Sequence, residues 1–182
     1  MQTLRMVILT CVILTIILFV SVIIFIYSGI FDVSAQGKEN PLLHWLLTTT
    51  RERSITVHAA EIKVVPNLND PALIMEGSNH YQEMCVECHR APGLADSETS
   101  KGLNPSPPNF SQMKNLDLTP AEMFWIIKNG IRMTGMPSWG VTHDDEKIWA
   151  LTAFVRKLPH MTPAEYQAIA GKAESTEEHH IH

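Results

Sequence analysis

Cysteine is scarce in this 182-residue sequence, which contains only three. This excludes a small scaffold held together by several disulfides. Cations are also in the minority, because 14 Lys and Arg stand against 19 Asp and Glu and give a net charge of −5. A nucleic-acid-binding domain needs clustered cations for its phosphate contacts, and no basic stripe is present, so nucleic acid is not an expected partner. The length leaves room for one folded domain and an appendage.

Charged residues are absent between Arg5 and Asp32. Residues 6–31 are mostly Ile, Val and Leu, and a helix over them would be about 39 Å long, enough to span a hydrocarbon core of about 30 Å. The alternative is a cleaved secretory signal, for which residues 33–35 offer a small-residue cleavage site. Because the apolar run far exceeds the usual signal core of about 7–15 residues, we predict an uncleaved transmembrane anchor.

The orientation of this anchor follows from the positive charge at its short end. Arg5 and the amino terminus favour a cytoplasmic location for residues 1–5, since positive charge tends to stay on that side. The rest of the chain is then exported. In a bacterium, the anchor would lie in the inner (cytoplasmic) membrane and the folded domain on its periplasmic side.

Residues 32–71 are predicted to connect the anchor to the folded domain. Within them, a short helix beginning at Pro41 carries a cluster of apolar side chains, namely Leu42, Leu43, Trp45, Leu46 and Leu47. These side chains could lie on the membrane surface, with Trp45 at the level of the headgroups. They could equally pack on the folded domain or on a partner subunit, and the sequence leaves the three alternatives open.

Beyond residue 71 the sequence predicts helices joined by loops. We expect them over residues 72–84, from 120 to about 129 after a capping box that begins at Thr119, over 142–158, and over 162–170. No run alternates convincingly with period two, so we expect no sheet and an all-α fold.

The helices delimit a folded domain over residues 72–170. The polar residues 171–182 are predicted to form a flexible tail. Its histidines, His179, His180 and His182, could bind a metal weakly, but we assign them no function.

The segment Cys85-Val86-Glu87-Cys88-His89 has the C-x-x-C-H spacing by which haem c is attached. Two thiols must reach the two vinyl groups on one edge of the porphyrin, and the next residue must place an imidazole on the iron. A redox dithiol would need a βαβ context, and a zinc site would need a second pair of ligands. The exported part contains no further cysteine. We therefore predict one haem c, bound covalently through Cys85 and Cys88, with His89 on the iron.

With this motif, residues 72–160 resemble a class I cytochrome c, here of the monohaem, membrane-anchored bacterial type. In that family a glycine and an aromatic residue, eight and four residues before the first haem cysteine, mark the crossing of the first and last helices. Gly77 and Tyr81 occupy these positions, and Leu151 and Phe154 match the pattern of the last helix. The resemblance implies a small helical domain in which Gly77 permits a close helix crossing despite its cost of up to about 1 kcal/mol in a helix.

The resemblance also implies a second iron ligand, usually a methionine in a loop before the last helix and often followed by proline. Met136, in Gly135-Met136-Pro137, fits this pattern and is our choice. Met133 lies three residues earlier and lacks the proline, and His143 would give bis-histidine ligation. Both remain alternatives.

Two further residues complete the expected haem site. A ligating histidine usually donates its other ring N–H to a carbonyl, and class I cytochromes use a proline in the loop after the haem motif. Pro108 is our choice and Pro92 is the rival. Trp139, like Trp125, could line the haem pocket or bind a propionate, with plain core packing as the alternative for each.

A haem iron with two protein ligands has no vacant position for a substrate, and a thioether ligand favours ferrous iron. We therefore predict an electron-transfer protein, not an enzyme, held in membrane lipid by its N-terminal helix. It would act as a tethered carrier or as a subunit of a respiratory complex. Its partners would be a quinol-oxidising complex, a dehydrogenase or a terminal oxidase. The alternative is a haem enzyme, peroxidase-like or reducing a small ligand, with an open distal iron site.

Overall fold

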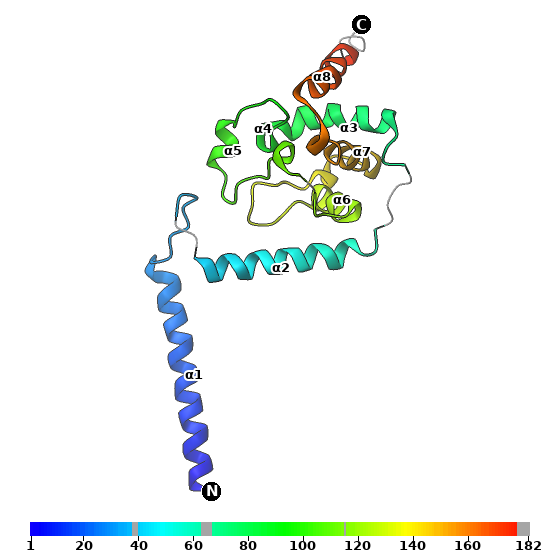
Figure 1. Ribbon diagram of the computed structural model, residues 1–182. Helices are drawn as coiled ribbons and strands as arrows, with labels where there is room; N and C mark the ends of the chain where they lie inside the picture. The colour runs from blue at the N-terminus through cyan, green and yellow to red at the C-terminus, as the bar shows by residue number, and fades with distance from the viewer. Residues whose placement is uncertain (38–39, 63–66, 115, 178–182) are drawn as a thin grey trace. The chain divides into compact units, whose positions relative to one another are not determined.

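The computed structural model describes residues 1–37, 40–62, 67–114 and 116–177, and the histidines of the tail lie outside these ranges. The residues so described form α-helices and short 3-10 helices without any strand, which confirms the all-α prediction (Figure 1). The chain divides into two compact units, residues 1–38 and residues 39–182.

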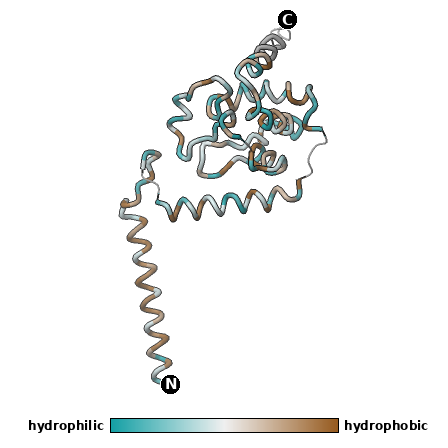
Figure 2. The backbone as a smooth tube through the Cα atoms, viewed as in Figure 1, coloured by the Kyte–Doolittle hydropathy of each residue, from teal (hydrophilic) through white to brown (hydrophobic). Residues whose placement is uncertain are grey.

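The first unit is built on α1, Gln2–Ser28, which ends at Gly29 in the left-handed conformation. Its side chains are exposed and mostly apolar, and Figure 2 shows this helix largely in brown, with hydrophilic colour near its N-terminal end. The hydroxyls of Thr10 and Thr15 donate to the carbonyls of Met6 and Cys11 at 2.9 and 2.8 Å, so these polar groups are satisfied within the helix. Helix α1 is long and apolar enough to cross a membrane, a test that an N-terminal signal sequence also passes.

The second unit is centred on the crossing of α3, Pro71–Met84, with α7, Asp145–Val155. At the crossing a Cβ on Gly77 would lie 2.0 Å from the carbonyl oxygen of Ala150 and 2.9 Å from Cβ of Phe154. The rings of Tyr81 and Phe154 lie 5.3 Å apart beside it, and both side chains are fully buried. The close crossing implied at Gly77 is therefore present, because no side chain fits between these backbones.

Helix α6, Pro120–Asn129, lies against α7 and begins where the sequence predicts. Thr119 and Glu122 form the capping box, and Gly130 is the C-cap. The buried ring of Phe124 stacks on Trp149 of α7 at 4.2 Å between centroids. This pair joins α6 to the central helix and so places the loop that follows Gly130.

Helix α2, Pro41–Ala59, is longer than the short helix predicted for the connector. Its C-terminal half packs on α6, with Ile55 and Ala59 buried. The Thr56 hydroxyl donates to the Glu122 carboxylate at 2.8 Å, and the His58 ring lies 5.6 Å from that of Trp125. This packing holds the C-terminal half of α2 on the folded domain, but most of the side chains for which the three alternatives were left open are exposed, namely Leu42, Trp45, Leu46 and Leu47.

Two other helix boundaries differ from the prediction. Helix α7 begins at Asp145 and not at Thr142, because the Asp144 side chain accepts from the Lys147 N–H and caps the helix there. Helix α8, Pro163–Glu177, continues beyond residue 170 into the segment predicted to be a tail. The remaining elements are α4, Val86–His89; α5, Glu98–Gly102; η1, Phe110–Gln112; η2, Trp139–Val141; and η3, Leu158–His160.

Candidate haem site

The C-x-x-C-H motif lies at the end of α3 and forms one further helical turn, α4. The N–H groups of Cys88 and His89 donate to the Cys85 carbonyl at 3.1 and 2.8 Å, so this turn brings the two thiols and the imidazole together. Cys85 and Cys88 are both free thiols. The turn ends at Arg90, whose φ of +63° is in the left-handed region.

Contacts from outside the motif hold this turn in place. The Tyr81 hydroxyl donates to the Arg90 carbonyl, and the Arg90 guanidinium pairs with Asp96 at 2.6 Å. The Ser97 hydroxyl donates to the Glu87 carbonyl at 2.6 Å. Burial raises the pKa of the Tyr81 hydroxyl well above its usual range, with a smaller contribution from the charge of Cys85, so it remains a hydrogen-bond donor.

His89 is oriented by a hydrogen bond and by a ring contact. Its Nδ1 lies 3.0 Å from the carbonyl oxygen of Pro108, and its ring stacks on Phe110 at 4.7 Å and 14°. With Nδ1 donating to that carbonyl, Nε2 is the nitrogen available to a metal. Burial lowers the pKa of His89, only partly opposed by the Pro108 hydrogen bond, and so favours the neutral imidazole that ligates metals.

The two cysteines fit a covalently bound porphyrin better than a zinc ion or a reactive dithiol. Burial, reinforced by the neighbouring Cys88, raises the pKa of the Cys85 thiol to about 12. Metal ligation and thiol–disulfide exchange both use the thiolate, which burial disfavours at Cys85. In the part of the chain that the structure describes, no three His, Cys, Asp or Glu side chains are grouped so that they could hold a metal ion. A buried, neutral Cys85 thiol, three residues before a second free thiol that the imidazole of His89 follows directly, suits haem c.

Met136 lies in a loop that leaves α6 at Gly130 and returns to it. The Ile131 N–H donates to the Met136 carbonyl at 3.2 Å, and the Met136 N–H donates to the Thr134 hydroxyl at 3.1 Å. The Met136 side chain is half-buried and packs on the hydrophobic core, whereas Met133 is 82% exposed. The loop therefore turns the thioether of Met136 toward the domain and that of Met133 toward solvent.

The loop is also fastened to α6 beyond Met136. The Ser138 hydroxyl donates to the Lys128 carbonyl at 2.8 Å. A Cβ on Gly130 would lie 2.6 Å from the carbonyl carbon of Pro137 and 2.8 Å from the Met136 oxygen. Glycine is therefore required there both by its φ of +67° and by the close return of the chain.

The remaining candidates for the haem site are His143 and the two tryptophans, Trp139 and Trp125. The third possible ligand, His143, is half-buried, and its ring lies 5.5 Å from that of His80 and 5.8 Å from that of Trp139. Trp139, in η2, is half-buried and packs on the hydrophobic core. Trp125 instead contacts His58 of α2, so it takes part in the packing between helices.

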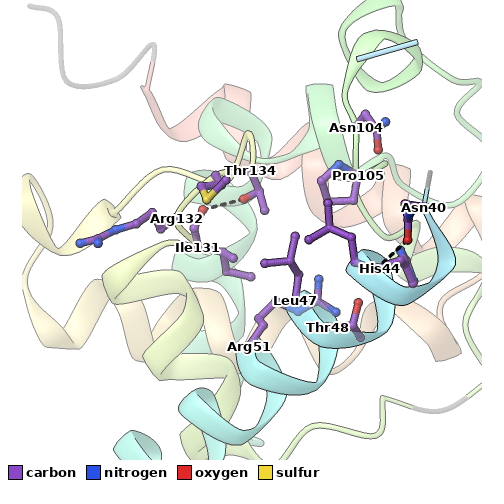
Figure 3. Close-up of a pocket in the computed structure, with 12 residues that line it drawn as sticks. Asn40, His44, Leu47, Thr48, Arg51, Asn104, Pro105, Ile131, Arg132 and Thr134 are labelled. Carbon is purple, nitrogen blue, oxygen red and sulfur yellow. Dashed lines mark hydrogen bonds between the residues drawn. The ribbon is translucent and has the colours of Figure 1, made fainter. Parts of the chain in front are cut away.

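A separate hollow of about 240 Å³ lies between the first half of α2 and two loops of the domain (Figure 3). Leu43 and Leu47 line it from α2, and Pro105 and Ile131 from the loops. Arg132 is also at this hollow, but its side chain extends away from it in Figure 3. Met133, one of the alternative ligands, also lines this hollow, whereas Cys85, Cys88, His89 and Met136 do not.

Comparison with known proteins bears on residues 72–155. This segment matches the family described as cytochrome C oxidase, cbb3-type, subunit III. None of the curated proteins matches the chain. Among solved structures, a chain of the Kuenenia stuttgartiensis reducing HAO-like protein complex Kustc0457/Kustc0458 is 23% identical over 54% of this chain, with a TM-score of 0.45. The match spans 47% of that chain, about half of its length. The family match, the haem-attachment motif within it and the all-helical fold together identify residues 72–155 as a c-type cytochrome domain.

Proposed function

We propose that this protein is a membrane-anchored monohaem c-type cytochrome that carries single electrons between respiratory partners on the periplasmic side. The observation that carries the proposal is the turn from Cys85 to His89, on which two free thiols precede an imidazole already oriented by the Pro108 carbonyl. When bound, a haem supplies a reversible one-electron couple, and the protein contributes burial, orientation and docking.

In this proposal each residue of the site has a separate task. Cys85 and Cys88 hold the single haem covalently, and His89 ligates its iron through Nε2. Pro108 keeps the His89 ring in place through the 3.0 Å hydrogen bond, which also makes the imidazole a better ligand. Trp139 covers the haem pocket on the side of the methionine loop, in line with its half-buried position on the core.

Met136 is the proposed second ligand, and it is the residue that separates a carrier from an enzyme. Its loop is held by hydrogen bonds on both sides of the methionine, at Ile131 and at Ser138. Such a loop keeps a weak thioether ligand near the iron and closes the site to peroxide or other small molecules. The packing of Met136 on the core favours a carrier over the haem enzyme.

The proposed location and partners follow from α1 and from the domain. Helix α1 would remain as a single-pass anchor in the inner membrane, with residues 1–5 in the cytoplasm. A tether raises the effective concentration of the domain near its partners in the same membrane. Suitable partners are a quinol-oxidising complex, a dehydrogenase or a terminal oxidase, and the chain would serve them as a tethered carrier or as a fixed subunit.

The test of the proposed ligation is optical. In the oxidised holoprotein, a sulfur–iron charge-transfer band is expected in the far red. Met136→Ala should abolish this band, whereas the matched variant Met133→Ala should retain it, because Met133 is 82% exposed. Loss of the band in Met133→Ala would show that the ligand is misassigned. A mature protein whose mass contains no added haem would overturn the whole proposal.

A further inference from the structure

The first two turns of α2 expose an apolar surface that the rest of the domain leaves uncovered. Leu42, Trp45 and Leu46 are exposed to 70, 61 and 51%, and their i, i+3, i+4 spacing places them on one face. We call these three residues the membrane patch. Two turns further along the same face, the exposed residues are Glu52 and Arg53, and beyond them Val57, 61% exposed, is a single apolar side chain.

Another side of α2 packs on the domain. Ile55 and Ala59 are buried against α6, and Thr56 donates to Glu122 at 2.8 Å. On the inner side of the first two turns, Leu43 lines the hollow of Figure 3 together with Leu47. The helix is thus held to the domain by its C-terminal half, and the membrane patch points away from the side that packs.

The position of the patch in the chain indicates what covers it. Twelve residues, 29–40, separate the end of α1 from the start of α2. Fully extended, they reach at most about 40 Å. An exposed patch of two leucines and a tryptophan is therefore kept close to any membrane that α1 spans, and tryptophan prefers the lipid–water interface.

Attraction between Arg51 and the lipid headgroups is not what would hold this part of α2 at a membrane. Arg51 and Glu52 lie 3.8 Å apart, so their opposite charges largely offset each other. We propose that the membrane patch inserts into the lipid–water interface and fixes the orientation of the cytochrome domain on the membrane. This inference rests on the proposed anchoring by α1. It adds a second, shallow attachment by which one side of the domain always faces the lipid.

The experiment uses the full-length holoprotein in phosphatidylcholine vesicles. In a Cys11→Ser background, Leu46→Cys and Arg53→Cys are each labelled with a small fluorophore; Cys85 and Cys88 do not react because the haem occupies them. The two positions are seven residues apart on one face, so Arg53→Cys is the matched control. Quenching is measured with nitroxide on the upper acyl chain of the lipid and with iodide in the water.

The label at 46 should be quenched by the lipid nitroxide and lose its iodide quenching relative to the label at 53. Equal iodide quenching at both positions overturns the inference, as does equal quenching of both by the lipid, which would place the whole helix in the interface. Shielding of residue 46 from both quenchers also overturns it and points to a second copy or a partner subunit.

The anchor is tested separately with the native Cys11, labelled in the otherwise unchanged chain and exposed to nitroxide near the end of the acyl chain. If Cys11 is quenched and residue 46 remains open to iodide, the inference fails while the proposed anchoring stands. If Cys11 is not quenched, both fail.

Discussion

Replacement of Gly77 by alanine tests the helix crossing on which the cytochrome domain is built. The new Cβ would lie 2.0 Å from the Ala150 carbonyl oxygen, whereas ordinary van der Waals contact begins at 3.4 Å. Helices α3 and α7 would have to separate by more than an ångström, because the obstructing atom belongs to backbone. This movement would also disturb the buried contact between Tyr81 and Phe154.

The magnitude follows from two opposing effects. Alanine favours a helix over glycine by about 1 kcal/mol, while overpacking of a close contact costs about 1–3 kcal/mol and occasionally more. Since a backbone carbonyl cannot rotate away, we place the cost at the upper end and expect Gly77→Ala to lower the free energy of unfolding by about 2 kcal/mol.

The assay is guanidinium unfolding of the full-length protein in detergent, followed by far-ultraviolet circular dichroism. Gly102→Ala is the control, because a Cβ on Gly102, at the end of α5, would have no neighbour within 4 Å. Gly102→Ala should leave the free energy of unfolding nearly unchanged or slightly raise it. If Gly77→Ala proves as stable as this control, the close crossing does not exist in solution.

Three further outcomes are expected from other contacts. Thr119→Ala removes the capping box of α6 and should lower the free energy of unfolding by about 1 kcal/mol in the same assay. Tyr81→Phe leaves the Arg90 carbonyl without its donor and should cost about 1–3 kcal/mol, measured against wild type. The Thr119 backbone N–H, and next the Thr56 hydroxyl, hold the pKa of Glu122 below its usual range. The ionised Glu122 carboxylate therefore stabilises the folded protein at pH values above the ordinary glutamate pKa, and this stabilisation is lost as the pH falls through the lowered pKa of Glu122. Glu122→Gln should accordingly make the free energy of unfolding depend less on pH in that acidic range.

The sequence predicts those parts of the fold that depend on neighbouring residues. The start of α6 at Pro120 follows from the Thr119–Glu122 capping box, and the same signal at Thr162 and Glu165 marks the start of α8. The crossing at Gly77 was implied by the resemblance to a class I cytochrome c, and the close approach found there explains why a glycine is tolerated within a helix despite its cost.

Other boundaries depend on competition between equally plausible residues. Both Thr142 and Asp144 can cap a helix, but the Thr142 hydroxyl contacts Nδ1 of His143 at 2.8 Å, and α7 begins after Asp144. Gly171 suggests a helix end, yet α8 continues to Glu177. Neither outcome can be read from residue type alone, because the spacing suits both choices.

The contacts that orient the site are mostly long-range, and the sequence gives only partial signals for them. The stacking of Phe110 on His89 joins residues far apart in the chain, as does the packing of α2 on α6 through Ile55 and Ala59. For the first, the resemblance pointed to Pro108, two residues before Phe110, but it did not predict the stacking itself. For the second there was none, because the apolar residues of α2 suit a membrane surface equally well.

The return of the Met136 loop to α6 has a consequence for local opening. Hydrogen bonds of main-chain and hydroxyl groups hold the segment from Gly130 to Ser138 as a closed loop against the C-terminal end of α6. The backbone at Met136 cannot move away from α6 unless several of these contacts break together. Amide protons of Ile131 and Met136 should then exchange with deuterated water at one shared rate, which is the rate at which this loop opens.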